Sequence, residues 1–299
     1  MTERNNTVVV GVDGSAGAEE AVRWAARLAS GRALDLELVH GLQIAAFCYG
    51  GGFPGSDVLF EQLRQEGDGI VAKARELALS VDSALTVRTD VLTDTATPAL
   101  LDRSRHVRMI VLGRTGTGGF TGMLVGATAA AVASHAACPV AVVRGRHGDG
   151  SVPVDGSVVV GVDGTPNSEA AVAVAFEEAA FRGVGLVAIH AWNDVTYDSV
   201  EGTARLMPQP EVLEPTEKRL LAQRLAGWQE KYPDVEVRRE VVRDRPRHAL
   251  LAESDTAQLV VVGCRGRGGF AGMLLGSTSQ ALIHHASCPV IVVRPEAKQ

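Results

Sequence analysis

The sequence predicts an α/β protein with two tandem domains, each a doubly wound, five-stranded parallel sheet with helices on both faces. Three observations support this prediction. Short β-branched runs alternate with segments of helical periodicity through five cycles, a pattern typical of parallel sheets covered by helices. The whole pattern recurs at a constant offset of 150 residues, for example Gly11-Val12-Asp13-Gly14 and Gly161-Val162-Asp163-Gly164. Finally, a chain of 299 residues is long enough for about two domains.

The first half contains one complete set of alternating elements. Val8 to Val12 is an apolar run of the kind that is buried on both faces of a parallel sheet. Ser15 follows it as a candidate helix cap, and Glu19 suits the positive end of a helix dipole. We expect strands at 8–12, 34–40, 86–92, 109–112 and 140–144, and helices at 16–30, 58–80, 98–103 and 127–136.

The second half repeats this order after a glycine-rich connection. We expect a first domain at 1–145, a linker at 146–156 and a second domain at 157–299. Pro208, Pro210 and Pro215 place a loop at 191–214. The expected strands are 157–162, 186–190, 235–242, 259–262 and 290–294, and the expected helices are 167–182, 216–232, one after Arg245-Pro246, and 277–285.

Composition excludes several classes of function. The formal net charge of −6 argues against nucleic acid or an anionic membrane as the main partner. Four cysteines without a CxxC pair favour a reducing, cytoplasmic compartment. The alanine-rich run at 128–143 is interrupted by His135 and Pro139, so we expect no membrane span.

A glycine-rich segment is the candidate chemical centre. It follows an apolar strand, precedes a helix, and has the spacing Gly-x2-Gly-x9-Gly-Ser at Gly263, Gly266, Gly276 and Ser277. These glycines can adopt positive φ or admit a ligand close to the backbone, and backbone N–H groups at such a helix start bind phosphate. The segment lacks the lysine of a Walker A loop, and no GxGxxG follows the first strand.

This spacing resembles the ATP-binding signature of the universal stress protein family. The first-strand Val-Asp-Gly turn, the histidine that closes the second strand (His40, His190) and the final Cys-Pro-Val strand are also similar to that family. Because both halves carry these features, the chain resembles a tandem universal stress protein of the actinobacterial type. The resemblance implies Rossmann-like domains of the adenine nucleotide alpha hydrolase-like kind, and ATP in each crevice.

The resemblance also implies which residues bind the nucleotide. Asp163 contacts the nucleoside, the backbone of Ala191 faces the adenine, Gly263 lies near the ribose, and Arg265 adds positive charge. The implied second site comprises Gly161, Val162, Asp163, Ala191, Gly263, Arg265, Gly266, Gly276, Ser277, Thr278 and Ser279, with the phosphates held by Gly266, Gly276, Ser277 and Ser279. The implied first site comprises Gly11, Val12, Asp13, Gly41, Gly113, Gly116, Gly126, Ala127 and Thr128.

The first site departs from the signature. Ala127 replaces the signature Ser/Thr, Ala129 stands opposite Ser279, and Thr115 replaces Arg265. Each lost hydroxyl contact is worth about 0.5–1.5 kcal/mol, so backbone donors can still sustain binding. We therefore expect the first site to bind ATP more weakly than the second.

Several of these residues also have purely structural interpretations. Gly14 is typical of a turn, Asp13 and Asp163 of turn or cap positions, and His40 and His190 of hydrogen-bonded histidines at strand ends. His135 with Cys138, and His285 with Cys288, give only two potential ligands per half, so we expect no metal site. The turn Arg243-Asp244-Arg245 is either solvated or lies beside the phosphates.

Three functions remain open at the level of sequence. The first is a nucleotide-dependent regulator of stress response or growth, binding ATP, with Mg²⁺ at the phosphates, as a homodimer with a regulatory protein partner. The second is a slow ATPase or phosphotransferase that uses a bound divalent cation. The third is a scaffold without nucleotide. Neither half repeats a Ser-His-Asp arrangement, paired carboxylates or an evident general base, so we expect no catalytic residue.

Overall fold

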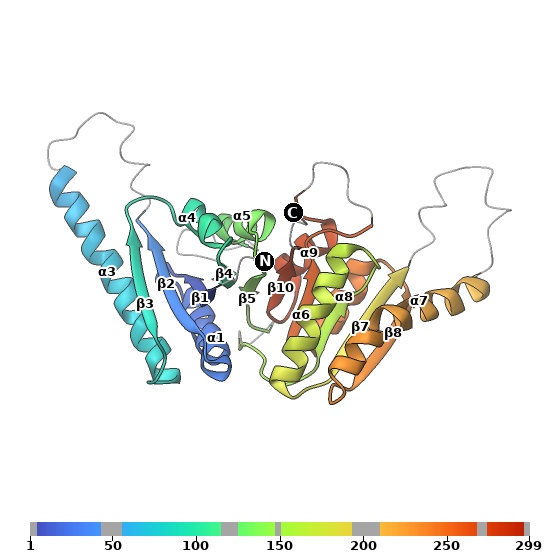
Figure 1. The fold of residues 1–299 in the computed structure, drawn as a ribbon. Coiled ribbons are helices and arrows are strands. Elements are labelled where there is room, and N and C mark those ends of the chain that lie inside the picture. The colour runs from blue at the N-terminus through green and yellow to red at the C-terminus, as the bar shows by residue number, and fades with distance from the viewer. Residues whose placement is uncertain are drawn as a thin grey trace, which may run out of the picture. The chain divides into compact units, whose positions relative to one another are not determined.

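The computed structural model describes residues 5–42, 56–114, 125–146, 151–192, 210–267 and 274–295. Internal contacts divide the chain into two compact units, Met1–Arg144 and Gly145–Gln299. Figure 1 shows that each unit is an α/β sandwich in which strands and helices alternate along the chain.

The first domain contains a five-stranded parallel sheet in the order β3-β2-β1-β4-β5. The chain runs outward from β1 to β3 and then returns to the other side of β1, so the strand order reverses between β1 and β4. The strands are β1 (Asn5–Gly11), β2 (Asp35–Gly41), β3 (Val87–Leu92), β4 (Val107–Gly113) and β5 (Val140–Val143). The helices are α1 (Ala16–Arg32), α3 (Ser56–Val81), α4 (Ala96–Arg103) and α5 (Ala127–His135).

The second domain repeats this topology, with parallel strands in the order β8-β7-β6-β9-β10. The reversal of strand order therefore falls between β6 and β9. The strands are β6 (Val158–Gly161), β7 (Leu186–Trp192), β8 (Val237–Arg243), β9 (Leu259–Gly263) and β10 (Val290–Val293). The helices are α6 (Pro166–Arg182), α7 (Pro210–Lys231), α8 (Pro246–Ser254) and α9 (Ser277–His285). The predicted fold class is confirmed.

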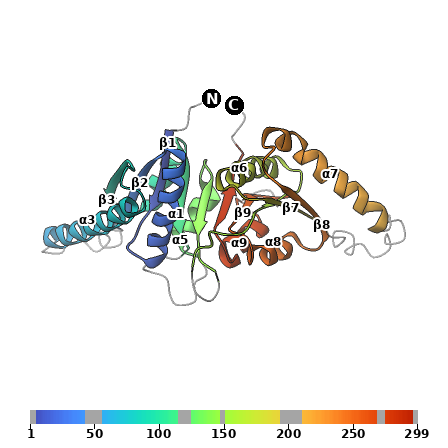
Figure 2. The ribbon, with the colours of Figure 1, turned by 90° about the horizontal axis from the view of Figure 1, so that it is seen from below.

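Helices cover both faces of each sheet (Figures 1 and 2). In the first domain α1 contacts α3, and α4 contacts α5; in the second, α6 contacts α7, and α8 contacts α9. The central strands are buried on both sides, as Val8, Val9 and Val10 of β1 show with no exposed surface. This double burial explains why the strands consist of continuous β-branched runs without polar alternation.

The turn after the first strand is built in the same way in both domains. Gly14 and Gly164 have φ angles of +79° and +77°, values that L-residues with a side chain rarely adopt. The next helix starts at a side-chain cap, because Ser15 Oγ accepts the Ala18 N–H and Thr165 Oγ1 accepts the Ser168 N–H. The predicted turn and cap at Gly14 and Ser15 are confirmed.

Helix α7 starts earlier than the prolines predicted. We expected a loop up to 214 and a helix from Thr216, whereas α7 begins at Pro210 and includes Pro215. A proline at the first helical position loses nothing, because that N–H has no partner within the helix. Pro215 lies past the first turn and removes one backbone hydrogen bond, which the remaining helix tolerates.

None of the helices in the described segments combines the length and the apolar character that crossing a bilayer requires.

Candidate functional site

The two candidate sites lie where the strand order reverses. Strand β6 pairs with β9, and β1 pairs with β4, so the turn that follows the first strand of each domain lies beside the loop that follows the fourth. In open α/β sheets, ligands bind in the crevice outside the carboxyl ends of the strands at this point. The structure therefore brings the two motifs of each half to one edge of the sheet.

Asp163 connects the two motifs in the second domain. Its Oδ1 accepts the N–H of Thr165 at 2.9 Å and the hydroxyl of Thr165 at 2.7 Å. Its Oδ2 accepts the backbone N–H of Arg267, beyond the strand end of β9, at 3.1 Å. A β-carbon on Gly266 would lie 2.7 Å from the same Oδ2, so a larger residue there would displace the Asp163 carboxylate. Asp163 thus has both a turn-forming and a loop-holding role.

The glycines at the ends of β4 and β9 allow a helix to approach the strand. A β-carbon on Gly263 would lie 2.8 Å from the backbone of Asn167 in α6, and one on Gly113 would lie 2.5 Å from the backbone of Gly17 in α1. Among the described glycines, positive φ occurs only at Gly14, Gly156, Gly164 and Gly183. Of the two alternatives for Gly263, Gly266 and Gly276, positive φ does not occur, and each has another part of the chain close to the position of its missing side chain.

Gly276 is the N-cap of α9 and leaves the helix start open. Its φ of −73° is ordinary, no side chain caps the first turn, and its own N–H donates to the Cys264 carbonyl at 2.8 Å. A β-carbon there would lie 3.3 Å from Cα of Arg265, so the helix start adjoins the loop. Ser277 is exposed and Thr278 half-buried. Unpaired backbone N–H groups and a nearby hydroxyl suit an anionic group.

Ser279 has a different environment from Ser277. Its side chain is 2% exposed, and its hydroxyl donates to the Gly263 carbonyl at 2.7 Å. This bond links the second turn of α9 to the end of β9. A direct contact of this hydroxyl with phosphate stays a prediction, and the geometry gives Ser279 a positioning role.

The first domain keeps the backbone of this arrangement and lacks two of its hydroxyl groups, those of Ser277 and Ser279. Gly126 caps α5 with a φ of −67°, and its N–H donates to the Arg114 carbonyl at 2.7 Å, as Gly276 does to Cys264. Ala127 is exposed and Thr128 half-buried. Gly116 lies outside the described residues. Where Ser279 donates to a strand end, the first domain has Ala129, which is buried and has no hydroxyl.

The remaining predicted residues surround the same crevices. Gly11 and Gly161 are packed against leucine side chains, Leu112 and Leu250, which leaves no room for a side chain of their own. Val12 and Val162 extend the first strands, with N–H groups that donate to Val39 and Ile189. Gly41 adjoins the backbone before α4, while Ala191 pairs with Val242 in β8. Asp13 accepts the Ser15 N–H at 3.0 Å.

The strand-end histidines act as hydrogen-bonding groups, with His40 half-buried and His190 buried. His40 and His190 contact the carbonyls of Val12 and Val162 at 2.8 and 2.7 Å through Nδ1. His190 is 1% exposed, and its Nε2 lies 2.7 Å from a carboxylate oxygen of Glu217 in α7. The structural interpretation of the histidines is confirmed. The periodicity of the sequence did not indicate that Glu217 contacts His190, because a long segment of chain separates α7 from β7.

Two arginines at the second site were missed by the sequence analysis. A β-carbon built on Gly164 would lie 3.3 Å from Nη2 of Arg267 and 3.6 Å from Nε of Arg224 in α7. Arg224 also forms an ion pair with Glu169. Only the Arg-Gly-Arg-Gly sequence of the loop could have indicated that Arg267 lies at the site. Nothing in the sequence of α7 indicated this for Arg224.

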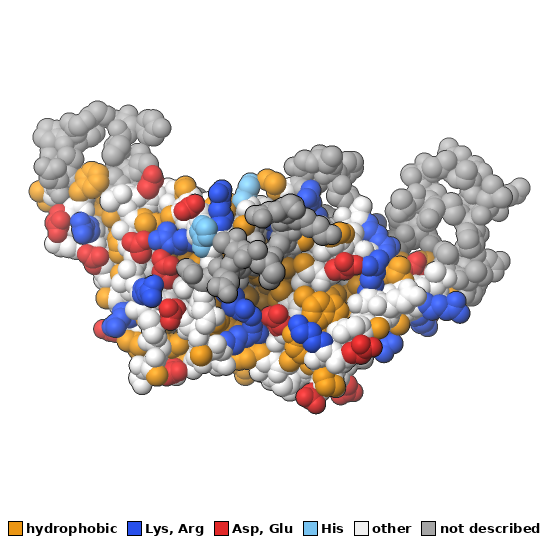
Figure 3. Space-filling model, viewed as in Figure 1, with side chains coloured by type: hydrophobic (Ala, Val, Ile, Leu, Met, Phe, Trp, Pro, Cys, Tyr) orange, Lys and Arg blue, Asp and Glu red, His pale blue; other side chains and the backbone are white. Residues whose placement is uncertain are grey.

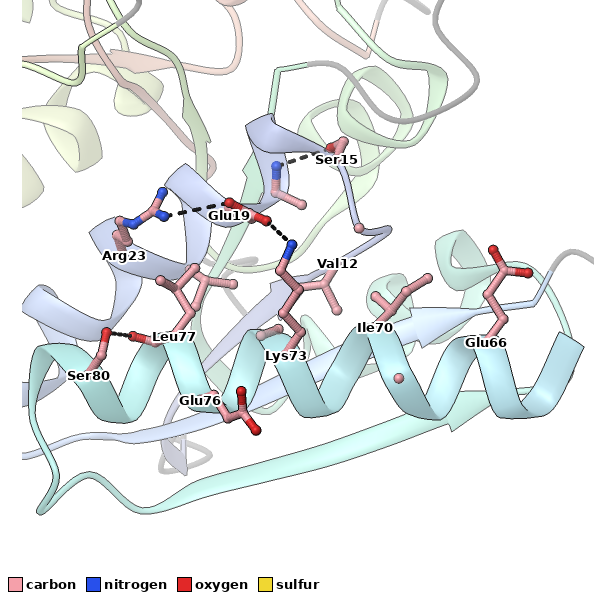
Figure 4. Close-up of a pocket in the computed structure, with 15 residues that line it drawn as sticks. Val12, Ser15, Glu19, Arg23, Glu66, Ile70, Lys73, Glu76, Leu77 and Ser80 are labelled. Atoms are coloured by element: carbon pink, nitrogen blue, oxygen red, sulfur yellow. Dashed lines mark hydrogen bonds and ion pairs between the residues drawn. The ribbon is translucent and has the colours of Figure 1, made fainter.

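A separate open pocket of about 640 Å³ lies between α1 and α3 of the first domain (Figure 4). Among the described residues of the predicted site, Val12 alone lines it, beside Lys73. Apolar side chains such as Val22, Ile70 and Leu77 form its walls. Lys73 lies across it and donates to Glu19 at 2.7 Å, and this hydrogen bond lowers the pKa of Glu19 below its ordinary value of 4.5.

The charged residues of the surface are mixed. Over the first domain in Figure 3, acidic and basic side chains are interspersed, with no continuous basic face on that side.

In the second domain, Asp244 and His248 form a hydrogen-bonded pair on the surface, and this bond lowers the pKa of Asp244. Among the described residues no group of three or more His, Cys, Asp or Glu side chains has metal-binding geometry.

Comparison with known proteins gives one consistent family. A model of the universal stress protein family matches residues 4–144 and again 156–294. The universal stress protein Rv2005c of Mycobacterium tuberculosis is 42% identical over 297 residues, covering 97% of this chain and 98% of that protein. A universal stress protein of Mycolicibacterium smegmatis is 41% identical over 293 residues, covering 96% and 97%.

A solved structure agrees at the level of fold. The crystal structure of a universal stress protein from Archaeoglobus fulgidus superposes with a TM-score of 0.70 at 16% sequence identity, covering 97% of this chain and 99% of that chain.

Proposed function

Because the chain belongs to the universal stress protein family, we propose that it binds ATP and acts as a nucleotide-dependent regulator of stress response or growth. The main site is the crevice at the carboxyl ends of β6 and β9. Nucleotide occupancy changes the binding of a protein partner or the oligomeric form. The observation that carries this proposal is the juxtaposition of the Asp163 turn with the Gly263–Ser279 segment at the reversal of strand order.

The described residues fit the phosphates of a nucleotide. The start of α9 presents N–H groups that no side chain caps, and Ser277 adds an exposed hydroxyl. The helix dipole favours negative charge at this end. Because residue 276 is glycine, the start of α9 lies close to the loop, with no side chain between them. A β-carbon on Gly276 would lie 3.3 Å from Cα of Arg265. Asp163, at the other side of the crevice, is suited to the nucleoside.

We propose that any Mg²⁺ arrives with the nucleotide. The described residues offer no cluster of three or more metal-ligating side chains, so the phosphates would supply most of the ligands.

We also propose that the protein is a cytoplasmic homodimer. Light scattering with and without ATP measures the oligomeric form, and a monomer under both conditions contradicts the dimer.

The first test is the nucleotide content of the purified protein. The protein is denatured and its released nucleotides are quantified for the native chain and for Gly276→Glu, with Gly126→Glu as the matched change in the first domain. We expect close to one ATP per chain, lost with Gly276→Glu and retained with Gly126→Glu. Two ATP per chain would show that both sites bind despite Ala127. No adenine nucleotide, and no uptake of added ATP, would refute the proposal.

A further inference from the structure

The duplicated turns after β1 and β6 face different chemistry. In the first domain, a β-carbon on Gly14 would meet Ile70 of α3 at 3.3 Å. Figure 4 shows Ile70 on the side of α3 that faces this turn, with Lys73 one turn further along and bonded to Glu19. In the second domain, the equivalent point beside Gly164 meets the guanidinium groups of Arg267 and Arg224. The surroundings of this point are therefore apolar in the first domain and positively charged in the second.

These two arginines come from separate parts of the domain. Arg267 lies just past Gly266, and its backbone N–H is held by Asp163 at 3.1 Å. Arg224 projects from α7 and pairs with Glu169 in the first turn of α6. Nitrogens of both side chains lie within 3.7 Å of one point, so two positive charges share a small region at the start of α6. The positive end of the α6 dipole adds to this field.

Two carboxylates, Asp163 and Glu169, lie near these arginines, and neither forms an ion pair with the side chain of Arg267. Both oxygens of Asp163 already accept hydrogen bonds from Thr165 and from the Arg267 backbone. Glu169 engages Arg224 and is 50% exposed. Within the described parts of the chain, the side chain of Arg267 forms no hydrogen bond or ion pair. Guanidinium groups bind phosphate oxygens more strongly than neutral donors do.

We propose that Arg224 and Arg267, together with Arg265, form an anion subsite that makes the second site selective for nucleotides with a long phosphate chain. This inference rests on the proposed nucleotide site. The first domain has Ala74, Thr115 and Thr117 at the corresponding positions, 150 residues earlier. It therefore lacks the subsite, and it discriminates far less between ATP and AMP.

The test replaces Arg224 and Arg267, one at a time, with the residue that the first domain has at the same position. Arg224→Ala and Arg267→Thr are made in full-length protein that carries Gly126→Glu, so that titration reports the second site alone. Affinities for ATP, ADP, AMP and adenosine are measured by calorimetry at one salt concentration. We expect each change to lower the affinity for ATP by about tenfold and the affinity for adenosine by less than about twofold. The arginines form charged hydrogen bonds only with phosphates, which adenosine lacks.

Two controls separate charge from folding. Arg267→Lys keeps the charge and is expected to retain most of the preference for ATP. Arg219→Ala removes a positive charge from the same helix, five residues before Arg224 and so about 140° around the helix axis, and is expected to leave ATP affinity unchanged. Thermal melting of each variant checks the fold.

Each outcome decides the inference. If each variant loses ATP and adenosine affinity equally, or if ATP affinity is unchanged in both variants, the anion subsite is refuted. The proposal that the second domain binds ATP still stands in either case. Absence of binding by any adenine nucleotide to the protein before the arginine changes overturns the proposed function, and the subsite with it.

Discussion

Removal of the Ser279 hydroxyl tests how α9 is fixed to the end of β9. Ser279 is 2% exposed, and its bond to the Gly263 carbonyl measures 2.7 Å. Loss of one such buried hydrogen bond is worth about 0.5–1.5 kcal/mol. We expect Ser279→Ala to lower the free energy of unfolding of the second domain by this amount, and to change ATP affinity by less than about twofold, because the hydroxyl donates to the backbone and not toward the crevice.

The measurement exploits the distribution of tryptophans. Trp24 lies in the first domain, whereas Trp192 and Trp228 lie in the second, so a Trp24→Phe background makes fluorescence in urea report the second domain alone. This separation matters because a two-domain chain need not unfold in a single transition.

Ser277→Ala is the matched control for this change. Its side chain is exposed at the first helical position, so we expect weaker ATP binding with unchanged stability. Unchanged stability with ATP binding about two- to twelvefold weaker in Ser279→Ala, the effect of one lost contact, would refute the positioning role and place this hydroxyl on the phosphates.

Three further predictions concern packing and charge. Gly263→Ala places a β-carbon 2.8 Å from the Asn167 backbone and is expected to destabilise the second domain by about 1–3 kcal/mol in urea unfolding, where unchanged stability would argue against the close contact. Phe176→Ala removes a fully buried ring at a cost of about 3–5 kcal/mol, and a smaller loss would mean that the surrounding aromatic rings collapse into the space. The Lys73 bond lowers the pKa of Glu19, so its contribution is present above the ordinary pKa and is lost as pH falls below 4.5. Lys73→Met should therefore cost up to about 1 kcal/mol at neutral pH and nothing in acid, while a pH-independent difference in urea midpoints would contradict this account.

The sequence was sufficient for the fold because the fold depends on local patterns. Continuous apolar runs identify strands that are buried on both faces, and the cap at Ser15 marks where the first helix begins. The repeat then places equivalent strands at equivalent positions. Paired parallel strands end at one edge of the sheet, so the Asp163 turn and the Gly263 loop lie side by side because β6 pairs with β9.

The parts that the sequence missed depend on contacts between distant segments. Arg224 reaches the crevice only because α7 packs on α6, and nothing in its own helix marks that position as functional. Ser279 has the same hydroxyl as Ser277, but the helix turns it toward the strand, and only the helical rotation decides which hydroxyl is buried. Pro215 was predicted to lie in a loop but lies inside α7, because a helix can continue past the loss of one hydrogen bond.

The duplication separates what the fold requires from what the ligand requires. Both domains keep glycine at the end of the fourth strand, where a helix backbone comes within 2.8 Å of the missing side chain, and positive φ at the turn after the first strand. Both also close the loop with the same backbone bond, from Gly126 to Arg114 and from Gly276 to Cys264. The side chains around the crevice differ instead. Since the first domain folds in the same way with Ala127, the Ser277 hydroxyl of the second domain is not needed to form its backbone. The presence of this exposed hydroxyl, beside the arginine pair, is the reason to place the main nucleotide site in the second domain.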